Sequence, residues 1–562
     1  MSFKPLTLSL SVAPQLSEAD VAEAAAQGFR SLISHRPDGE EPGQPSAADM
    51  RALAEAHGLA FAHVPAIPGQ IGDADIAAMA DTLASLPGPV LAFCRTGTRA
   101  ATLWALTQAG KTPADTLLAA TAAAGYDLEA LRPRLQAAAE APAPAQSPAH
   151  TPADTPPSAR ADIVIVGGGS AGLATAASLR ARDKSLDIVI IEPKDTHYYQ
   201  PGWTLVGGGA FSQAETLRDE AGLIPSGTRW IRGAVASFQP DRNQVTLADG
   251  STIGYRALVV APGNVLDWEG VDGLPQTLGK NGVTSNYGFE TAPYTWELVQ
   301  KLRGGTAIFT QPPMPIKCAG APQKAMYLSC DHWRREGVLD QIDVQFHSAG
   351  AVIFGVKEFV PALMSYVERY GIDLNFESTL IAVDGPARRA TFREKQGEVS
   401  RSFDVLHVSP PQKAPAFLAN SPLADKAGYT DVDPATLQHV RHPNVFGLGD
   451  AGGMSNAKTM AAARKQAPVV AENLLAMLAN KPLDAIYDGY GSCPLTVERG
   501  KVVLAEFGYG GKLLPSFPHW LIDPTRPQWL SWVLKARVLP WIYWHGMLKG
   551  HEWLARPEHR GA

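Results

Sequence analysis

The residues of this sequence best suited to chemistry are its cysteines, which number four in 562 residues: Cys94, Cys318, Cys330 and Cys493. A thiol becomes reactive where a helix N-terminus or a nearby cation lowers its pKa and favours the thiolate. Cys318 meets both conditions, because it directly precedes a predicted helix over roughly 321–337 and has Lys317 and Lys324 beside it. The sequence therefore predicts a reactive thiol at Cys318. The alternative is a small buried cysteine that serves only for packing.

Cys330 is a poor disulfide partner for Cys318. The two residues lie 12 positions apart, which on one helix corresponds to about 18 Å at a rise of about 1.5 Å per residue. A disulfide needs Cα atoms within about 7 Å of each other. We therefore expect Cys330 to be unpaired with Cys318.

A second candidate thiol is Cys94, in the loop Cys-Arg-Thr-Gly-Thr-Arg between a predicted strand and a predicted helix. Backbone N–H groups, the helix dipole and Arg99 would hold an oxyanion there and favour the Cys94 thiolate. A phosphatase loop of the form Cys-x5-Arg needs arginine at position 100, which is Ala100. Arg99 closes a shorter loop, of the length found in rhodaneses, and this favours sulfur transfer. Phosphatase activity and an inactive module stay open as alternatives.

A glycine-rich segment predicts dinucleotide binding. The pattern G-x-G-x-x-G begins at Gly167, directly after the apolar strand 163–166, and opens a helix. Gly167 permits a tight turn, Gly169 lets the backbone approach a pyrophosphate, and Gly172 allows the helix to pack closely on the strand. Glu192 closes the next strand, where an acid can bind a ribose hydroxyl. The expected contacts of the cofactor in this turn are Gly167, Gly169, Ser170, Ala171 and Gly172.

Two further segments favour FAD over NAD as the dinucleotide. Ala261 and Gly263 follow a second apolar strand, and Asp450 ends a strand near the C-terminus in the string Val-Phe-Gly-Leu-Gly-Asp. A second glycine fingerprint for NAD(P)H is expected between these segments. Its candidate place is 342–356, which contains Ser-Ala-Gly-Ala at 348–351 and no G-x-G-x-x-G. We therefore expect no nicotinamide site.

Several unusual strings resemble sulfide:quinone oxidoreductases of the type found in mitochondria and many bacteria, and the resemblance covers about 160–555. They are HYYQPGWTLVGGG at 197–209, PIKCAGAPQKAMYLS at 315–329, HVSPP at 407–411, PNVFGLGD at 443–450 and YDGYGSCPL at 487–495. The resemblance implies FAD, a quinone acceptor and Cys318 as the thiol that carries sulfur beside the flavin. It also implies that Gln200, Asp450 and Lys458 contact the cofactor. Asp450 would hold the ribityl chain, and the Lys458 cation would stabilise the reduced flavin; the alternative for Lys458 is an exposed lysine at a helix start.

One position departs from this family. Its members usually carry a second cysteine directly after the Gly-Asp near the C-terminus, where this chain has Ala451. Cys493 lies in a string that the family shares without using it in catalysis, so we expect it to serve for packing. Three routes stay open: an external thiol or sulfide resolves a persulfide on Cys318, Cys94 does so, or the substrate is a persulfide or another thiol.

The elements that position these residues form an α/β architecture. Strand and helix patterns alternate over 1–137, which predicts a domain with a mostly parallel sheet. Its strings SHRPDGEEPGQP and AFCRTGTRA resemble tyrosine-phosphatase-like proteins regarded as sulfur transferases. A linker rich in Pro and Ala is expected over 138–160. A flavoprotein unit with two Rossmann-like, dinucleotide-binding halves is expected over 161–510, and membrane-interface helices over 511–562.

The last stretch combines tryptophan with basic residues. Its six tryptophans are Trp520, Trp529, Trp532, Trp541, Trp544 and Trp553, and its basic residues include Lys535, Arg537 and Lys549. The pattern predicts two short amphipathic helices broken at Pro540 that lie at a lipid interface, where a quinone could reach the flavin. The alternative is a helical pair that covers the flavin domain.

Composition narrows the class of protein. A formal net charge of −6 gives no reason to expect nucleic-acid binding. The N-terminus lacks the apolar region of a signal peptide, and no run of about 20 apolar residues suggests a membrane span. We therefore expect a protein of the cytoplasm, attached peripherally to the inner face of the membrane; the oligomeric state stays open.

Together these patterns predict FAD-dependent oxidation of sulfide, or of a related persulfide or thiol, with quinone as electron acceptor. A small thiol or sulfite would accept the sulfur, and the N-terminal domain would transfer it. Two other classes compete: an NAD(P)H-dependent disulfide or persulfide reductase, and a non-catalytic flavin redox sensor.

Overall fold

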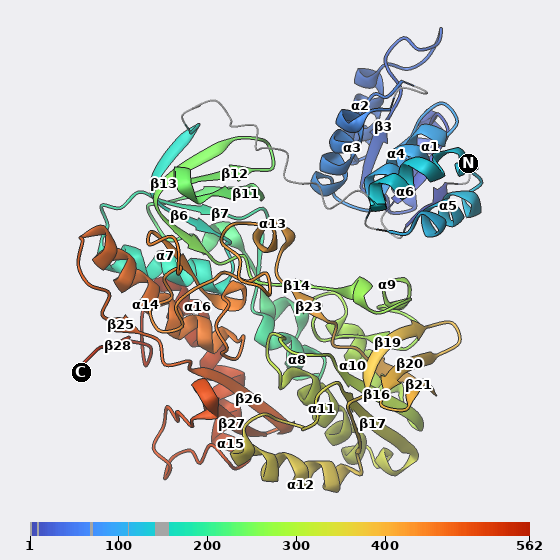
Figure 1. Cartoon of the computed structure of the whole chain (residues 1–562). Helices are drawn as coiled ribbons and strands as arrows, with labels where there is room; N and C mark the ends of the chain where they lie inside the picture. Colours follow the sequence, from blue (N-terminus) through green and yellow to red (C-terminus); the bar gives the residue numbers. More distant parts are fainter. Residues whose placement is uncertain (1–2, 8–9, 68–70, 111, 141–156, 562) are drawn as a thin grey trace. The chain divides into compact units, whose positions relative to one another are not determined.

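The chain forms two compact units, Met1–Thr155 and Pro156–Ala562. The computed structural model (Figure 1) describes residues 3–7, 10–67, 71–110, 112–140 and 157–561. The last helix of the first unit, α6, ends at Glu140, and the first strand of the second unit, β6, begins at Ala159. Most of the expected linker, 141–156, lies outside the described residues.

The first unit is built on a five-stranded sheet in the order β1-β2-β5-β3-β4. Its strands are β1 (Lys4–Pro5), β2 (Leu10–Ala13), β3 (Ser31–Ser34), β4 (Ala60–His63) and β5 (Val90–Phe93). All neighbours pair in parallel except β1 with β2, as the alternating strand and helix patterns predict. Its helices are α1 (Glu18–Ala26), α2 (Ala47–Ala56), α3 (Asp73–Ser85), α4 (Thr98–Gln108), α5 (Ala114–Ala123) and α6 (Arg132–Glu140).

Local capping sets where the first two helices begin. The hydroxyls of Ser17 and Ser46 accept hydrogen bonds from the N–H groups of Asp20 and Asp49, and each aspartate completes a capping box. Ser17 and Ser46 are therefore the N-caps of α1 and α2. The central strand β5 ends directly before Cys94, so the loop to α4 lies at the carboxyl end of a parallel sheet, where α/β folds place their sites.

The second unit opens with a sheet that carries the glycine turn. Strands β10, β7, β6, β13 and β24 pair in parallel, and β12 and β11 extend the sheet as an antiparallel pair. Helix α7 (Ser170–Arg182) follows β6 and packs against α14 (Met460–Leu478), as Figure 1 shows. The strands are β6 (Ala159–Val166), β7 (Ile188–Ile191), β10 (Thr228–Ile231), β11 (Val235–Gln239), β12 (Gln244–Leu247), β13 (Thr252–Val260) and β24 (Val445–Gly447).

A second parallel sheet follows, in the order β15-β22-β16-β17-β18. It consists of β15 (Val283–Thr284), β16 (Gly305–Gln311), β17 (Ile342–Ser348), β18 (Asp373–Phe376) and β22 (Val405–His407). Helices α10 (Ala292–Lys301), α11 (Ala321–Arg335) and α12 (Val360–Tyr370) accompany it, and β19 (Thr379–Asp384), β20 (Arg389–Glu394) and β21 (Gly397–Ser402) form a separate antiparallel sheet. The two parallel sheets match the predicted two-half, Rossmann-type architecture.

The strand order corrects the expected place of a second glycine fingerprint. In the first sheet β6 lies between β13 and β7, and in the second sheet β16 lies between β22 and β17. The turn that corresponds to the glycine turn is therefore the connection from β16 to α11, and not the end of β17. That connection reads Pro-Pro-Met-Pro-Ile-Lys-Cys-Ala-Gly and carries Cys318. It contains no G-x-G-x-x-G.

The C-terminal part joins the two halves. The hairpin of β26 (Gly491–Glu498) and β27 (Lys501–Phe507) packs on α11. A helical run then follows as α15 (Trp529–Val533), a π-helical turn (Leu534–Val538) and α16 (Leu539–His545). The predicted break at Pro540 is wrong, because the backbone stays helical through Val538 and Leu539. The π turn before Pro540 accommodates a residue that has no N–H to donate.

Short elements complete the second unit. They are α8 (Trp203–Val206), α9 (Leu274–Thr277), α13 (Ala416–Ala419), β8 (Thr196–Tyr198), β9 (Leu217–Asp219), β14 (Val265–Leu266), β23 (Gln412–Lys413), β25 (Ala485–Ile486) and β28 (Glu558–His559). Among the described residues, no helix combines the length and the apolar content that crossing a bilayer requires.

Candidate active site

One cavity of about 710 Å³ gathers the residues predicted to bind the dinucleotide. Its wall includes Gly167, Gly169, Ser170, Ala171, Glu192, Gln200, Ala261, Gly263, Cys318, Asp450 and Lys458. Most of these residues come from the carboxyl ends of β6, β7, β13 and β24 and from the connection between β16 and α11. Gln200 follows β8, and Lys458 precedes α14. The volume lies within the range of about 300–1,000 Å³ that ligand pockets occupy.

The glycines of the turn have distinct steric roles. Gly167 has φ +104°, and a Cβ there would overlap the carbonyl of Ala261. A Cβ on Gly172 would overlap the carbonyl of Gly167, so Gly172 lies behind the cavity wall and allows α7 to approach β6. Gly169, in contrast, faces open space, since no atom lies within 4 Å of a Cβ placed there. The backbone at Gly169 is therefore accessible to a ligand.

Glu192 lies one residue beyond β7, beside the glycine turn. One of its carboxylate oxygens accepts a hydrogen bond from the N–H of Gly168 at 2.8 Å, and the other accepts from the N–H of Lys194 at 3.0 Å. These bonds orient the carboxylate at the cavity wall. The second lone pair of each oxygen is left for a further donor such as a ribose hydroxyl.

Polar atoms without partners show that the cavity suits a polar ligand. Five atoms of wall residues are buried and have no hydrogen-bond partner: Trp203 Nε1, Glu220 Oε1, Asn264 Oδ1, Asn286 Nδ2 and Asn286 Oδ1. Buried polar atoms in native proteins are nearly always paired, because each orphan costs about 1–3 kcal/mol. A dinucleotide offers both donors and acceptors, so these residues fit FAD.

Charged residues lie deep in the cavity. Burial raises the pKa of Asp450, while the nearby Lys317 and Lys458 ammonium groups act in the opposite direction. Lys458 Nζ donates to the carbonyls of Asp450 at 2.8 Å and Gly452 at 2.7 Å, and burial lowers its pKa to about 8. Lys458 is 5% exposed, which excludes the alternative of an exposed helix-start lysine. Lys317 Nζ donates to the side-chain oxygen of Gln200 at 2.9 Å.

Cys318 lies at the cavity wall, just before α11. Its φ is +82°, a left-handed conformation that is costly for any residue with a Cβ and that persists only where the surroundings enforce it. Its sulfur receives a hydrogen bond from Lys324 Nζ at 3.2 Å. The predicted cation beside the thiol is therefore present, but it is Lys324 alone, since the Lys317 side chain turns toward Gln200.

The structure adds Cys493 to this site. Cys493 Sγ, from β26, lies 3.6 Å from Cys318 Sγ. The Cys493 thiol, followed by the Lys324 ammonium, holds the pKa of Cys318 well below its usual range against the effect of burial. The same contact, together with burial, raises the pKa of Cys493. These opposite directions favour the thiolate at Cys318, with Cys493 as the protonated partner.

The expectation that Cys493 serves for packing is incomplete. Cys493 is 1% exposed and belongs to a core cluster, but its sulfur also contacts the predicted reactive thiol. Cys330 is fully buried in the same core, and burial raises its pKa, as expected of an inert thiol. Ala451 lies buried in the core of the first sheet. Sequence patterns could not reveal the contact, because 175 residues separate Cys318 and Cys493.

Lys535 also differs from its predicted position. The amphipathic pattern placed it among the basic residues of a lipid-facing surface, but it is 6% exposed. Its Nζ donates to the carbonyl of Pro494 at 2.9 Å and to the hydroxyl of Thr496, one and three residues after Cys493 along β26. Burial lowers the pKa of Lys535 well below its usual range.

A chain of hydrogen bonds ties the C-terminal helices to the glycine turn. The hydroxyl of Tyr543, on α16, is bonded to Ser170 Oγ at 2.6 Å and to His197 Nε2 at 2.5 Å. His197 Nδ1 lies 3.0 Å from a carboxylate oxygen of the buried Glu220. Sequence reasoning did not single out Tyr543, His197 or Glu220; the only signal was the string that contains His197.

Apolar side chains remain exposed on the C-terminal part. They include Trp520, Leu521, Trp529, Leu530, Val538, Trp541, Trp553 and Leu554. Trp544, in contrast, is buried and contacts the rings of His197 and Tyr199. The segment therefore covers the flavin-type domain, as the alternative predicts, and it also exposes tryptophans; the lipid interface stays a prediction.

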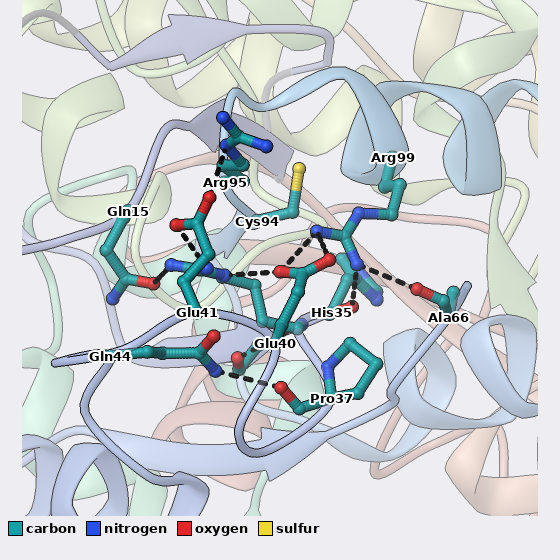
Figure 2. A network of polar contacts seen from close by, with 12 residues as sticks. Gln15, His35, Pro37, Glu40, Glu41, Gln44, Ala66, Cys94, Arg95 and Arg99 are labelled. Carbon is teal, nitrogen blue, oxygen red and sulfur yellow. Dashed lines mark hydrogen bonds and ion pairs between the residues drawn. The ribbon is translucent and has the colours of Figure 1, made fainter. Parts of the chain in front are cut away.

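The second predicted thiol, Cys94, lies in the first unit and is fully buried (Figure 2). The N–H of Gly97 donates to Cys94 Sγ at 3.1 Å, and α4 begins one residue later. Gly97 has φ +91°, and a Cβ there would overlap the Tyr126 hydroxyl, so this glycine is required for the loop to close around the thiol.

Arg99 has a different set of partners from the one expected. Its guanidinium donates to the carbonyls of His35 at 3.2 Å and Ala66 at 2.8 Å, and it pairs with Glu40 at 2.7 Å (Figure 2). These contacts tie the 34–45 segment to the Cys94 loop. The more exposed Arg95 pairs with Glu41 at 2.9 Å.

Together, the two parallel sheets and the dinucleotide cavity define a flavoprotein of the pyridine nucleotide-disulphide oxidoreductase class, whose family model matches residues 161–295. The mitochondrial sulfide:quinone oxidoreductase of Dictyostelium discoideum is 44% identical over 391 residues, which are 69% of this chain and 86% of that relative. The mouse protein of the same name is 38% identical over 393 residues, 69% of this chain and 87% of the relative. The chain belongs to the sulfide:quinone oxidoreductase family.

A solved structure shares the fold. The sulfide:quinone oxidoreductase from Aquifex aeolicus superimposes with a TM-score of 0.60 at 18% identity, covering 71% of this chain and 97% of that one. The first unit matches a different family model over residues 2–111, described as the phosphatase-like domain of beta-lactamase hydrolase-like protein. The protein of that name from Agrobacterium fabrum is 44% identical over 100 residues, 18% of this chain and 23% of the relative's length. The predicted phosphatase-like class of the first domain is confirmed.

Proposed function

We propose that the second unit oxidises sulfide, or a related persulfide or thiol, and that the electrons pass through FAD to a membrane quinone. The position of Cys318 carries this proposal: its sulfur is on the wall of the dinucleotide cavity, with the Lys324 ammonium 3.2 Å away. A thiolate beside a buried cation is a strong nucleophile and a natural carrier of sulfane sulfur. The family relatives named for sulfide and quinone support the same chemistry.

The cavity residues have separate roles toward FAD. The glycine turn and the N-terminus of α7 would hold the pyrophosphate, Glu192 a ribose hydroxyl and Asp450 the ribityl chain. Bound FAD supplies a two-electron carrier between a thiol and a quinone. Lys458 Nζ is held by two carbonyls and places a buried cation in the cavity. Gln200 is also a polar residue of the wall, and its side-chain oxygen accepts a hydrogen bond from Lys317.

The C-terminal part supplies the side of the cavity suited to a quinone. Phe517, Leu534, Leu539 and Ile542 form apolar wall on the same cavity as Cys318. The same segment exposes Trp529 and Trp541, and indole rings favour the interface between membrane and water. Peripheral attachment to the inner face of a membrane would let a quinone enter without crossing water.

The first unit would take part in sulfur transfer. The Cys94 loop provides one backbone donor to the sulfur and ends in a helix N-terminus, which suits a persulfide or a small oxyanion. A low-molecular-weight thiol or sulfite is the expected final acceptor of sulfur. Arg99 acts as a positioning residue in this proposal, because its guanidinium holds the carbonyls of His35 and Ala66.

Anaerobic mixing of the purified holoprotein with sulfide tests the proposal. Sulfide should bleach the flavin absorbance, and decylubiquinone should restore it. Cys318→Ser should abolish the bleaching, whereas Cys94→Ser should leave it intact and lose only the sulfane sulfur bound to the first unit. Rapid reduction by NADH without a response to sulfide would instead identify a nicotinamide-dependent reductase. A flavin that sulfide reduces without turnover to quinone would identify a redox sensor.

A further inference from the structure

We propose that Cys493 is the second redox thiol of the active site and forms a reversible disulfide with Cys318 during each catalytic cycle. This inference rests on the proposed oxidation of sulfide and names the thiol that leaves Cys318 when sulfur is loaded and pairs with it again on oxidation. It requires neither a cysteine at position 451 nor delivery of Cys94.

Distance is the first support for this pair. The two sulfur atoms lie 3.6 Å apart, and a disulfide bond is about 2.05 Å long. A closure of this size is within reach of side-chain rotation and small shifts of the backbone. The remaining thiol of the second unit, Cys330, lies in the third turn of α11, and the described structure gives its sulfur no thiol neighbour.

The backbone around the pair is shaped to bring the thiols together. Gly320 separates Cys318 from α11, and a Cβ on Gly320 would overlap the Leu495 side chain and lie 3.7 Å from Cys493 Cβ. A glycine at this point lets β26 approach the start of the helix. Cys318 itself is held at φ +82°, a strained conformation of the kind that is found mainly at functional sites.

Two buried lysine side chains face the pair from different elements. Lys324 of α11 donates to Cys318 Sγ, and Lys535 of the C-terminal π turn is anchored on the carbonyl of Pro494, next to Cys493. The other ionisable groups that act on the pair are Tyr287 and Asp450. Thiols that only pack against each other are not stabilised by a buried positive charge. A thiolate is stabilised by such a charge, and every thiol–disulfide exchange step needs a thiolate.

The catalytic cycle needs a small thiol to accept the sulfur and a quinone to accept the electrons. Hydrosulfide attacks Cys318 Sγ, the sulfur at the cavity wall, and the Cys318–Cys493 bond breaks; Cys318 becomes a persulfide anion and Cys493 takes the proton as a thiol. A small thiol then removes the outer sulfur as its own persulfide anion, which leaves two protein thiols. Oxidation of these two thiols re-forms the disulfide, and the electron pair and two protons reduce the quinone to quinol.

Peptide mapping of the full-length holoprotein tests the bond directly. After oxidation with decylubiquinone and alkylation without reductant, tryptic peptide 318–324 should be linked to the peptide that contains Cys493, through two or more sulfur atoms. The Cys330 peptide should be alkylated instead. Incubation with a reductant should release both partners. If quinone-oxidised protein carries alkylated Cys318 and Cys493, the inference is overturned.

Matched variants test the role in turnover. Cys493→Ala and Cys330→Ala each remove one buried sulfur, so their effects on packing are comparable. Quinone reduction by sulfide should fall about 100-fold in Cys493→Ala and stay within about twofold in Cys330→Ala. Wild-type turnover in a Cys493→Ala protein that retains FAD would overturn the inference and leave the proposed function standing, whereas absence of sulfide oxidation in the wild type would refute the proposed function. If Cys493→Ala does not fold, the mapping of the wild-type chain decides.

Discussion

At the scale of single residues, a few contacts decide how the active thiol behaves. Cys318 is buried, which by itself disfavours a thiolate. Its neighbours reverse this effect, because Cys493 donates to the sulfur and Lys324 provides a positive charge at 3.2 Å. The reactivity of Cys318 therefore depends on three residues: Cys318 in the loop before α11, Lys324 in α11 and Cys493 in β26.

Replacement of Lys324 should make this dependence measurable. In Lys324→Met the thiolate of Cys318 loses its cation, so the pKa of Cys318 should rise and alkylation by iodoacetamide should shift to higher pH. At pH 7 the alkylation rate should fall about tenfold. Lys324→Arg keeps the charge and serves as the control. An unchanged pH profile in Lys324→Met would show that the lysine does not act on the thiol.

At the scale of elements, the C-terminal helices have two roles. Tyr543 of α16 bonds Ser170 at the start of α7 and His197, while Lys535 of the π turn reaches β26 beside Cys493. The opposite side of the same run exposes Trp529 and Trp541. One helical segment therefore closes the dinucleotide cavity and also presents a surface suited to a membrane.

The Tyr543 hydroxyl should couple the helices to the cofactor site. Tyr543→Phe removes one bond to Ser170 and one to His197, so the free energy of unfolding should decrease by about 1–3 kcal/mol and FAD should dissociate more readily. Thermal unfolding and flavin release on dilution measure both effects. Trp541→Phe, on the exposed side of α16, is the control. Equal FAD affinity in the Tyr543→Phe and Trp541→Phe proteins would contradict the coupling.

At the scale of the whole molecule, buried histidines link stability to pH. Burial lowers the pKa of His35 in the first unit, and of His347, His407 and His439 in the second, from 6.5 to about 4. His407 is held neutral, because its Nε2 accepts the N–H of Asn286 at 2.9 Å. Between pH 6.5 and 4 the unfolded chain binds protons that the folded chain cannot, so stability falls as the pH falls.

This linkage predicts the slope of stability against pH. The midpoint of urea unfolding, followed by flavin fluorescence, should decrease steadily from pH 7 to pH 5, with His407 contributing up to about 3 kcal/mol over the full range. His407→Asn should be less stable at pH 7 but should show a shallower slope. His519→Asn, at an exposed site, should follow the wild type. Parallel slopes for wild type and His407→Asn would refute the assignment.

The sequence by itself determined the architecture and the dinucleotide turn, because these depend on short-range patterns. Alternating strands and helices indicate parallel sheets, and the spacing of Gly167, Gly169 and Gly172 is local to one turn. The same is true of the capped helix starts at Ser17 and Ser46. Local signals also marked Cys318, through the helix that follows it.

Only the tertiary structure decided which residues meet. Cys493 reaches Cys318 from a segment far along the chain, Lys535 reaches the strand that carries Cys493, and Tyr543 reaches Ser170 over 373 residues. The helical periodicity of the C-terminal segment could not tell a lipid-facing lysine from one turned inward, because Lys535 lies within a π turn, where the period of an α-helix does not apply. Side-chain contacts between distant segments arise from packing of whole elements, and no pattern within one segment encodes them.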